Sequence, residues 1–167
     1  ASGRKQAGPC ALAVLYDPTR CIGCQECVRA CAVENGGDEV AATSPEPQLT
    51  TRTLTVLRKY EPAVGAATFR KVQCMHCVDP ACVNACMLHS LQKDPVTGIV
   101  GYDPQYCVGC RYCQMACPYG VPKFEFEKAA PKIVKCELCR HRVGDAKLAD
   151  HGGFSRYTRG HGPACCE

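Results

Sequence analysis

The pattern of apolar and polar positions along the chain predicts small elements joined by loops. Residues 11–16 are an apolar run that ends at Asp17 and Pro18, which is typical of a strand entering a loop. Residues 88–93 and 99–102 flank a turn-rich segment that ends in Gly98. This arrangement predicts a β-hairpin.

One short helix and one further strand complete the predicted elements. Residues 28–34 fit two helical turns closed by Asn35 and two glycines. Residues 53–60 alternate well enough to form a strand, within a segment, 35–73, that contains no cysteine. We expect 35–73 to be an insertion that faces a partner; a plain solvent loop is the alternative.

Composition changes this picture, because 17 of the 167 residues are cysteine. The remaining apolar residues are mostly Ala and Val, with four Phe and no Trp. Such a chain builds only a small aliphatic core, and small domains of this kind usually depend on metals or disulfides. The cysteines are therefore expected to hold the fold together as well as to perform its chemistry.

Charge and hydropathy exclude two functional classes. The formal net charge is +4, but no run of basic residues favours nucleic-acid binding. No stretch reaches the roughly 18 apolar residues of a membrane span. The chain begins at Ala1 without an initiator Met or an apolar signal core, so we expect a mature or trimmed segment.

The cysteines fall into four motifs with metal-ligand spacing. They are Cys21, Cys24, Cys27 and Cys31; Cys74, Cys77, Cys82 and Cys86; Cys107, Cys110, Cys113 and Cys117, followed by Pro118; and Cys136, Cys139, Cys165 and Cys166. The first and third motifs are repeats, since Tyr16-Asp17-Pro18 and Tyr102-Asp103-Pro104 lead into them at the same offset.

These spacings indicate [4Fe–4S] clusters. A tight C-x2-C-x2-C loop presents three thiolates, and its backbone N–H groups point toward the sulfides. Gly23 and Gly109 allow the backbone to approach closely. In two-cluster ferredoxins the fourth Cys of the run ligates the other cluster and is followed by Pro, as Cys117 is by Pro118.

Disulfides and structural zinc are the competing interpretations. Cysteines two residues apart in repeated loops are poorly placed for structural bridges, and zinc uses pairs instead of runs of four. A zinc-stabilised interaction module would also lack the brown absorption of clusters. For His76, a role beside a cluster or at the surface is favoured over ligation, and Tyr106 and Tyr112 are expected to exclude water. Cys10 has no motif around it, so a free buried thiol is expected.

With these motifs in view, the chain resembles the four-cluster ferredoxin-type subunits of respiratory oxidoreductases. Gln73 to Pro80 is similar to the second motif of that family. Lys93 to Val100 and Ala116 to Lys123 are most like the iron–sulfur subunit of periplasmic membrane-bound nickel–iron hydrogenase.

The resemblance implies an α+β, loop-rich fold of two pseudo-twofold-related ferredoxin-like modules with small hairpins and short helices. An outer module would comprise 11–34 and 132–167, and an inner module 74–131. The implied ligand sets are Cys74, Cys77 and Cys82 with Cys117; Cys107, Cys110 and Cys113 with Cys86; Cys136, Cys139 and Cys165 with Cys31; and Cys21, Cys24 and Cys27, which lack a fourth ligand. We expect a Cys-Pro beyond Glu167 to complete the family's fourth motif and hence four clusters.

The implied function is a non-catalytic relay that passes single electrons between a catalytic subunit, most simply a hydrogenase, and a membrane quinone-reactive subunit. A molybdopterin enzyme, such as formate dehydrogenase or a sulfur-compound reductase, is the alternative partner. Location on the periplasmic side of the cytoplasmic membrane is implied as well. Several cations next to ligands are expected to raise cluster potentials. They are Arg20, Arg29, Arg111, Lys135 and Arg140.

Overall fold

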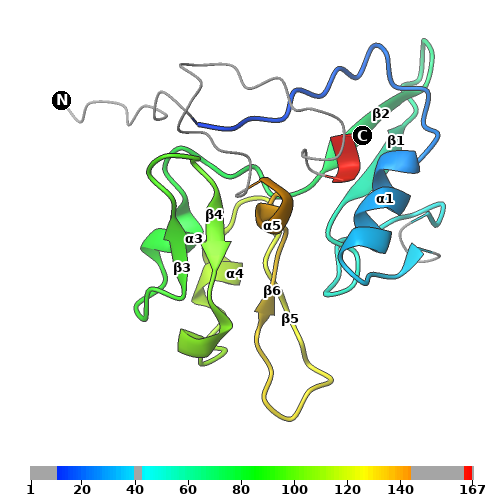
Figure 1. The fold of residues 1–167 in the computed structure, drawn as a ribbon. Helices are drawn as coiled ribbons and strands as arrows, with labels where there is room; N and C mark the ends of the chain where they lie inside the picture. The colour runs from blue at the N-terminus through cyan, green and yellow to red at the C-terminus, as the bar shows by residue number, and fades with distance from the viewer. Residues whose placement is uncertain (1–10, 40–42, 144–163, 167) are drawn as a thin grey trace.

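The computed structural model describes residues 11–39, 43–143 and 164–166, and shows short helices and two-stranded sheets joined by long loops (Figure 1). This agrees with the predicted small, loop-rich α+β class. The helices are α1 (Glu26–Glu34), α3 (Ala81–Asn84), α4 (Tyr112–Ala116) and α5 (Arg140–Val143), with 3-10 turns η1 (Pro104–Tyr106) and η3 (Ala164–Cys166). The strands are β1 (Val56–Tyr60), β2 (Thr68–Val72), β3 (Leu91–Lys93), β4 (Val100–Tyr102), β5 (Lys123–Phe124) and β6 (Ile133–Val134).

The predicted hairpin is confirmed as the antiparallel pair β3–β4, with Leu91 opposite Tyr102. Its turn is held by Asp94, whose Oδ1 accepts the amide protons of Val96 and Thr97 at 2.7 and 2.8 Å. These bonds lower the pKa of Asp94, the Thr97 amide most. Local turn chemistry therefore accounts for this element, as the sequence suggested.

The predicted helix is also confirmed, although α1 begins at Glu26, two residues earlier than expected. It ends at Glu34, and the backbone amide of the next residue, Asn35, donates to the Cys31 carbonyl at 3.2 Å. The strand predicted for residues 11–16 is wrong. In that segment the Leu12 amide donates a hydrogen bond to the Thr97 carbonyl at 2.8 Å, but no strand forms, and Leu15 is 95% exposed.

Strands β1 and β2 occupy the predicted insertion 35–73 and pack against the first cysteine motif. Leu57 of β1 is buried with Val28 of α1, and Phe69 of β2 packs against the same pair. A Cβ on Gly23 would lie 2.3 Å from the Phe69 ring. The strand predicted at 53–60 is confirmed from Val56 onward. The partner-facing role of 35–73 stays a prediction.

The core is divided into small clusters, and three of the four contain cysteines. The largest includes Leu91, Val100 and Ile133 together with Cys113. No helix in the described ranges has the length and apolar character needed to cross a membrane. Several of the described thiols therefore pack on the small clusters that the sparse aliphatic residues form.

Candidate metal centre

A cavity of about 260 Å³ is lined by one group of thiols, which we call the third set: Cys86, Cys107, Cys110 and Cys113. Cys86 follows α3 and comes from the second motif, whereas the other three belong to the third motif. Burial, together with the charges of the other three thiolates, raises the pKa of Cys113 to about 11. The structure thus brings together ligands from two motifs.

The second set consists of Cys74, Cys77, Cys82 and Cys117. Burial raises the pKa of Cys77, and the charges of Cys74 and Cys117 add to this increase. Burial also raises the pKa of Cys82, and the charges of Cys74 and Cys117 add to this increase, whereas the positive charge of Lys135 lowers it. Three thiols of the second motif therefore lie near one from the third.

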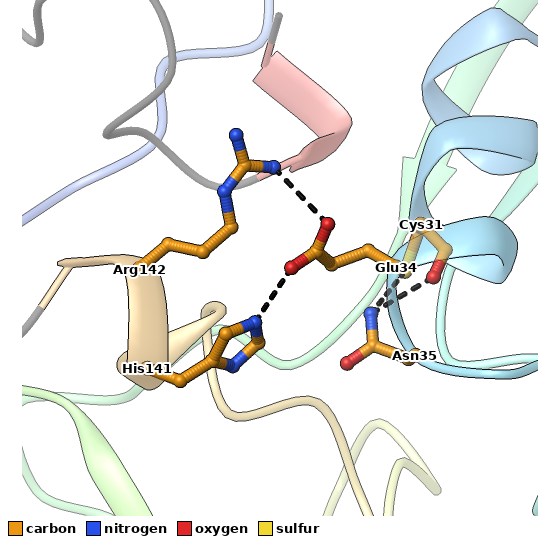
Figure 2. Close-up of polar contacts among 5 residues, drawn as sticks. All are labelled: Cys31, Glu34, Asn35, His141 and Arg142. Atoms are coloured by element: carbon orange, nitrogen blue, oxygen red, sulfur yellow. Dashed lines mark hydrogen bonds and ion pairs between the residues drawn. The ribbon is translucent and has the colours of Figure 1, made fainter.

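The fourth set consists of Cys31, Cys136, Cys139 and Cys165. Burial raises the pKa of Cys31, a hydrogen bond from Thr55 lowers it, and Cys165 and Cys139 raise it. Asn35 donates from Nδ2 to the Cys31 carbonyl at 2.8 Å and to its Sγ at 3.7 Å (Figure 2).

Contacts between α1 and the C-terminal segments bring this fourth set together. The 3-10 turn η3, which carries Cys165, packs against α1. In the last turn of α1, the Glu34 carboxylate is hydrogen-bonded to His141 and Arg142 of α5, so α1 and α5 are held together here (Figure 2).

The first set consists of Cys21, Cys24 and Cys27. Burial raises the pKa of Cys27, Lys71 lowers it, and the charges of Cys165, Cys21 and Cys24 raise it. Cys21 and Cys27 pack with Val28 and Leu57 in one small apolar cluster. The side chain of Cys166, and the whole of Cys10, lie outside the described residues.

Neighbouring sets approach one another in a single order. Cys82 of the second set packs on the core cluster that holds Cys86, Cys107 and Cys113. Burial raises the pKa of Cys136, and the negative charge of Cys74 in the second set raises it too. Burial likewise raises the pKa of Cys27 in the first set, and the charge of Cys165 in the fourth set adds to this increase. The row therefore runs third, second, fourth, first. Its two end sets contain the exposed cysteines Cys110 and Cys24.

All four loops turn in the same way around their first cysteine. The residue two positions later has a positive φ in every motif: Gly23 at 77°, His76 at 43°, Gly109 at 71° and Leu138 at 56°. This backbone direction brings N–H groups toward sulfur. The Leu138 amide lies 3.4 Å from Cys136 Sγ, and the Gly109 amide is among the groups that lower the pKa of Cys107.

These residues fit [4Fe–4S] clusters. The 15 cysteines that the structure describes are free thiols, so disulfides do not account for them. No three His, Cys, Asp or Glu side chains among the described residues are placed to hold one metal ion. A cubane binds each thiolate at a different iron and so spreads its ligands more widely.

Comparison with known proteins agrees with this chemistry. The sequence model of the 4Fe–4S dicluster domain matches residues 66–151, which is over half of the chain. This chain belongs to that family. The predictions of a ferredoxin-type protein and of [4Fe–4S] cofactors are therefore confirmed.

Several curated relatives align with most of this chain. The Hydrogenase-2 operon protein HybA of Escherichia coli O157:H7 is 37% identical over 171 residues, covering 95% of this chain and 49% of the relative. A sulfite dehydrogenase subunit of Allochromatium vinosum is 34% identical over 147 residues, covering 83% and 60%. The formate dehydrogenase-O iron-sulfur subunit of Escherichia coli K12 is 34% identical over 140 residues, covering 79% and 46%. The chain spans about half the length of these relatives.

The cations predicted to act on clusters occupy different environments. Lys135 is 4% exposed and donates to the carbonyls of Val100 and Cys136. Arg111 lines the third-set cavity with its guanidinium 5.4 Å from the Phe124 ring centroid. Arg29 instead pairs with Glu26 at the surface, and Arg20 is exposed. Lys135 and Arg111 therefore combine a cation with a position next to thiols.

The remaining sequence-predicted residues are placed as follows. His76 accepts the Val100 amide proton at Nδ1, 2.9 Å away, and burial lowers its pKa to about 3. Tyr106 lines the third-set cavity, whereas Tyr112 is exposed at the start of α4. Pro118 is exposed after Cys117.

Sequence reasoning missed two lysines and two tyrosines. Lys93 donates to the Cys77 carbonyl at 2.8 Å, and Lys71 to that of Cys165 at 3.1 Å. Tyr16 and Tyr102 pack against Cys21 and Cys107 respectively. The repeated Tyr-Asp-Pro before two motifs was the one signal in the sequence that pointed to these tyrosines.

Proposed function

We propose that this chain is a non-catalytic electron relay with four [4Fe–4S] clusters in the full-length protein. The second, third and fourth sets each ligate one cluster, and the first set ligates another with a ligand beyond Glu167. Each cluster accepts and donates one electron at a time. The inner and outer halves form two ferredoxin-like modules related by a pseudo-twofold axis.

The observation that carries this proposal is the single row of thiol sets. Adjacent sets are close enough for the charge of one to act on a thiol of the next, as Cys165 does on Cys27. The exposed cysteines Cys110 and Cys24 belong to the two ends. Ile22 and Val108 beside them are 82% and 71% exposed. A relay needs this arrangement, with shielded interior centres and an accessible centre at each end.

For the partners, we propose a hydrogenase catalytic subunit and a membrane quinone-reactive subunit on the periplasmic side of the cytoplasmic membrane. The identity to the Hydrogenase-2 operon protein, over 95% of this chain, supports this choice. A molybdopterin enzyme is the second candidate, favoured by the formate and sulfite dehydrogenase relatives. Purifying the complex under anaerobic conditions and assaying hydrogen, formate and sulfite as electron donors distinguishes them.

Iron and acid-labile sulfide analysis of the full-length protein, purified without oxygen, tests the relay itself. Four clusters give about sixteen irons per chain, whereas two give about eight. The visible spectrum should show broad brown absorption, which zinc does not produce. A colourless protein with bound zinc contradicts the proposal.

Replacing one cysteine in the third set and one in the fourth set tests the ligand assignments of these two sets. Cys86→Ser and Cys139→Ser should each affect one cluster, in the third and fourth sets respectively. Cys10→Ser, outside every motif, is the matched control and should leave the iron content unchanged. Loss of more than one cluster in a variant that stays folded contradicts the assignments.

A further inference from the structure

Tyr102 places a polar group at the wall of the third-set cavity. Its ring packs in the core cluster with Leu91, Ile133 and Cys107, and it lines the cavity together with the thiols. Its hydroxyl oxygen is buried and has no hydrogen-bond partner in the described part of the chain. Buried tyrosine hydroxyls usually have a partner, so this donor is available for the cavity's occupant.

Cys107 packs on the same core cluster as the Tyr102 ring and lines the same cavity, so its sulfur is the acceptor that we consider for that proton. It is also the first cysteine after Tyr102 in the chain, five residues further along. Burial and Cys107 together raise the pKa of Tyr102, which keeps the phenol protonated. The neighbouring Ser90 hydroxyl already donates to the Asp103 carbonyl at 2.6 Å.

The repeat supplies a matched residue with a different partner. Tyr16 stands before Cys21 as Tyr102 stands before Cys107. The Tyr16 hydroxyl donates to the Phe69 carbonyl at 2.8 Å. Cys21 also faces this hydroxyl and, after burial, raises the pKa of Tyr16. A phenol has one proton, however, and the short bond to Phe69 uses it.

We propose that Tyr102 is a positioning residue that sets the potential of the third-set cluster by donating a hydrogen bond to the Cys107 thiolate, and that Tyr16 has lost this role toward Cys21. The inference rests on the proposed relay function. A hydrogen bond to a ligand sulfur stabilises the reduced, more negative cluster and so raises its potential. The two halves of the repeat then hold their end clusters at potentials that are tuned differently.

The test is an EPR-monitored redox titration of the full-length, anaerobically purified protein. Tyr102→Phe keeps the ring and removes the donor. We expect the reduction equilibrium of one cluster to fall about tenfold, or 59 mV for one electron. Iron content and the other potentials should not change. Tyr16→Phe is the matched control and should leave all potentials unchanged.

Two results overturn the inference: unchanged potentials in Tyr102→Phe at full iron content, or equal shifts in both variants. Incorporating 3-fluorotyrosine into the wild-type protein gives a second test that does not depend on the folding of a variant. The more acidic phenol is a stronger donor, so one potential should rise, and unchanged potentials contradict the inference. Missing clusters in the wild-type protein would contradict the relay function instead, so the two failures are distinguishable.

Discussion

His141 and Glu34 are 107 residues apart in the sequence, yet His141 Nε2 lies 2.6 Å from Glu34 Oε1 (Figure 2). Arg142 reaches the other carboxylate oxygen at 3.5 Å. Glu34 follows Cys31 in α1, and His141 follows Cys139 in α5. The carboxylate therefore joins two of the three segments that carry the fourth set; the third is η3, which carries Cys165.

Replacing this carboxylate should loosen α5 without removing a ligand. In Glu34→Ala we expect the free energy of unfolding to fall by about 0.5–1 kcal/mol, because partly exposed ion pairs contribute little to stability. Hydrogen exchange of the α5 amides should become faster, and a chelator should remove iron sooner. Glu26→Ala is the control, since Glu26 pairs with Arg29 within α1. Identical α5 exchange in both variants contradicts the prediction.

A side chain at Gly109 should displace the third loop. Gly109 has a φ of 71°, and a Cβ there would lie 2.8 Å from the Pro131 carbonyl oxygen. Gly109→Ala is expected to lose the third-set cluster, seen as a drop of about four irons per chain. Gly36 has a similar φ of 61° with open space around it. Gly36→Ala should therefore cost only the left-handed strain of about 1–2 kcal/mol and keep all its iron.

The buried ammonium group of Lys135 should raise the potential of the clusters nearest to it. Burial raises the pKa of Cys82 and Cys136, and the positive charge of Lys135 opposes this increase at both thiols. In Lys135→Gln we expect at least one potential to fall by about 59 mV, a tenfold change for one electron. Arg29→Gln, whose side chain is 54% exposed, is the control with no expected shift. Unchanged potentials in Lys135→Gln at full iron content would contradict this role.

The ring of His76 should stabilise the hairpin through its acceptor nitrogen. His76→Leu leaves the Val100 amide without the bond that Nδ1 provides, at a cost of about 1–3 kcal/mol. His76→Asn restores an acceptor in nearly the same place and should recover much of that loss. Hydrogen exchange of the Val100 amide measures both effects. Equal protection in the Leu and Asn variants would show that the acceptor does not matter.

The exposed apolar residues at the two ends should govern contact with partners. Val108→Glu and Ile22→Glu are expected to keep their iron and their reduction by dithionite. Each should slow electron exchange with one subunit of the purified complex, measured as substrate-driven cluster reduction or quinone-dependent oxidation. Val96→Glu is the control, because Val96 lies in the β3–β4 turn and is 53% exposed. If this control slows exchange as much as the end variants do, the prediction is wrong.

Local features of the fold were predictable, because they depend on neighbours in the sequence. The turn at Asp94 determines the β3–β4 hairpin, and Asn35 follows the end of α1. Spacing within the first three motifs places at least three thiols close together in the sequence, so these cysteines could be predicted as ligands. The strand predicted at residues 11–16 failed because an apolar run does not specify a partner edge. Its one described backbone bond, from Leu12 to Thr97, is too little to form a strand.

The long-range features were not predictable from residue patterns alone. The packing of β1 and β2 on the first motif depends on contacts of Leu57 and Phe69 with Val28. The sequence of segment 35–73, which contains no cysteine, does not indicate these contacts. Tyr102 and Lys71 lie only five and three residues before Cys107 and Cys74, but their place in the sequence does not show which atoms their side chains reach. Their roles follow from the direction of the side chain, which only the folded structure provides.

The separation of Cys31 from Cys139 and Cys165 also has a consequence in time. Chains emerge from the ribosome N-terminal part first. The thiols of the second and third sets emerge within residues 74–117, whereas the fourth set is complete only after Cys165 has emerged. If the proposed ligand sets are right, the fourth set is therefore the last of these three to have all its ligands available for a cluster. Its presence in a purified molecule reports that synthesis reached the end of this segment.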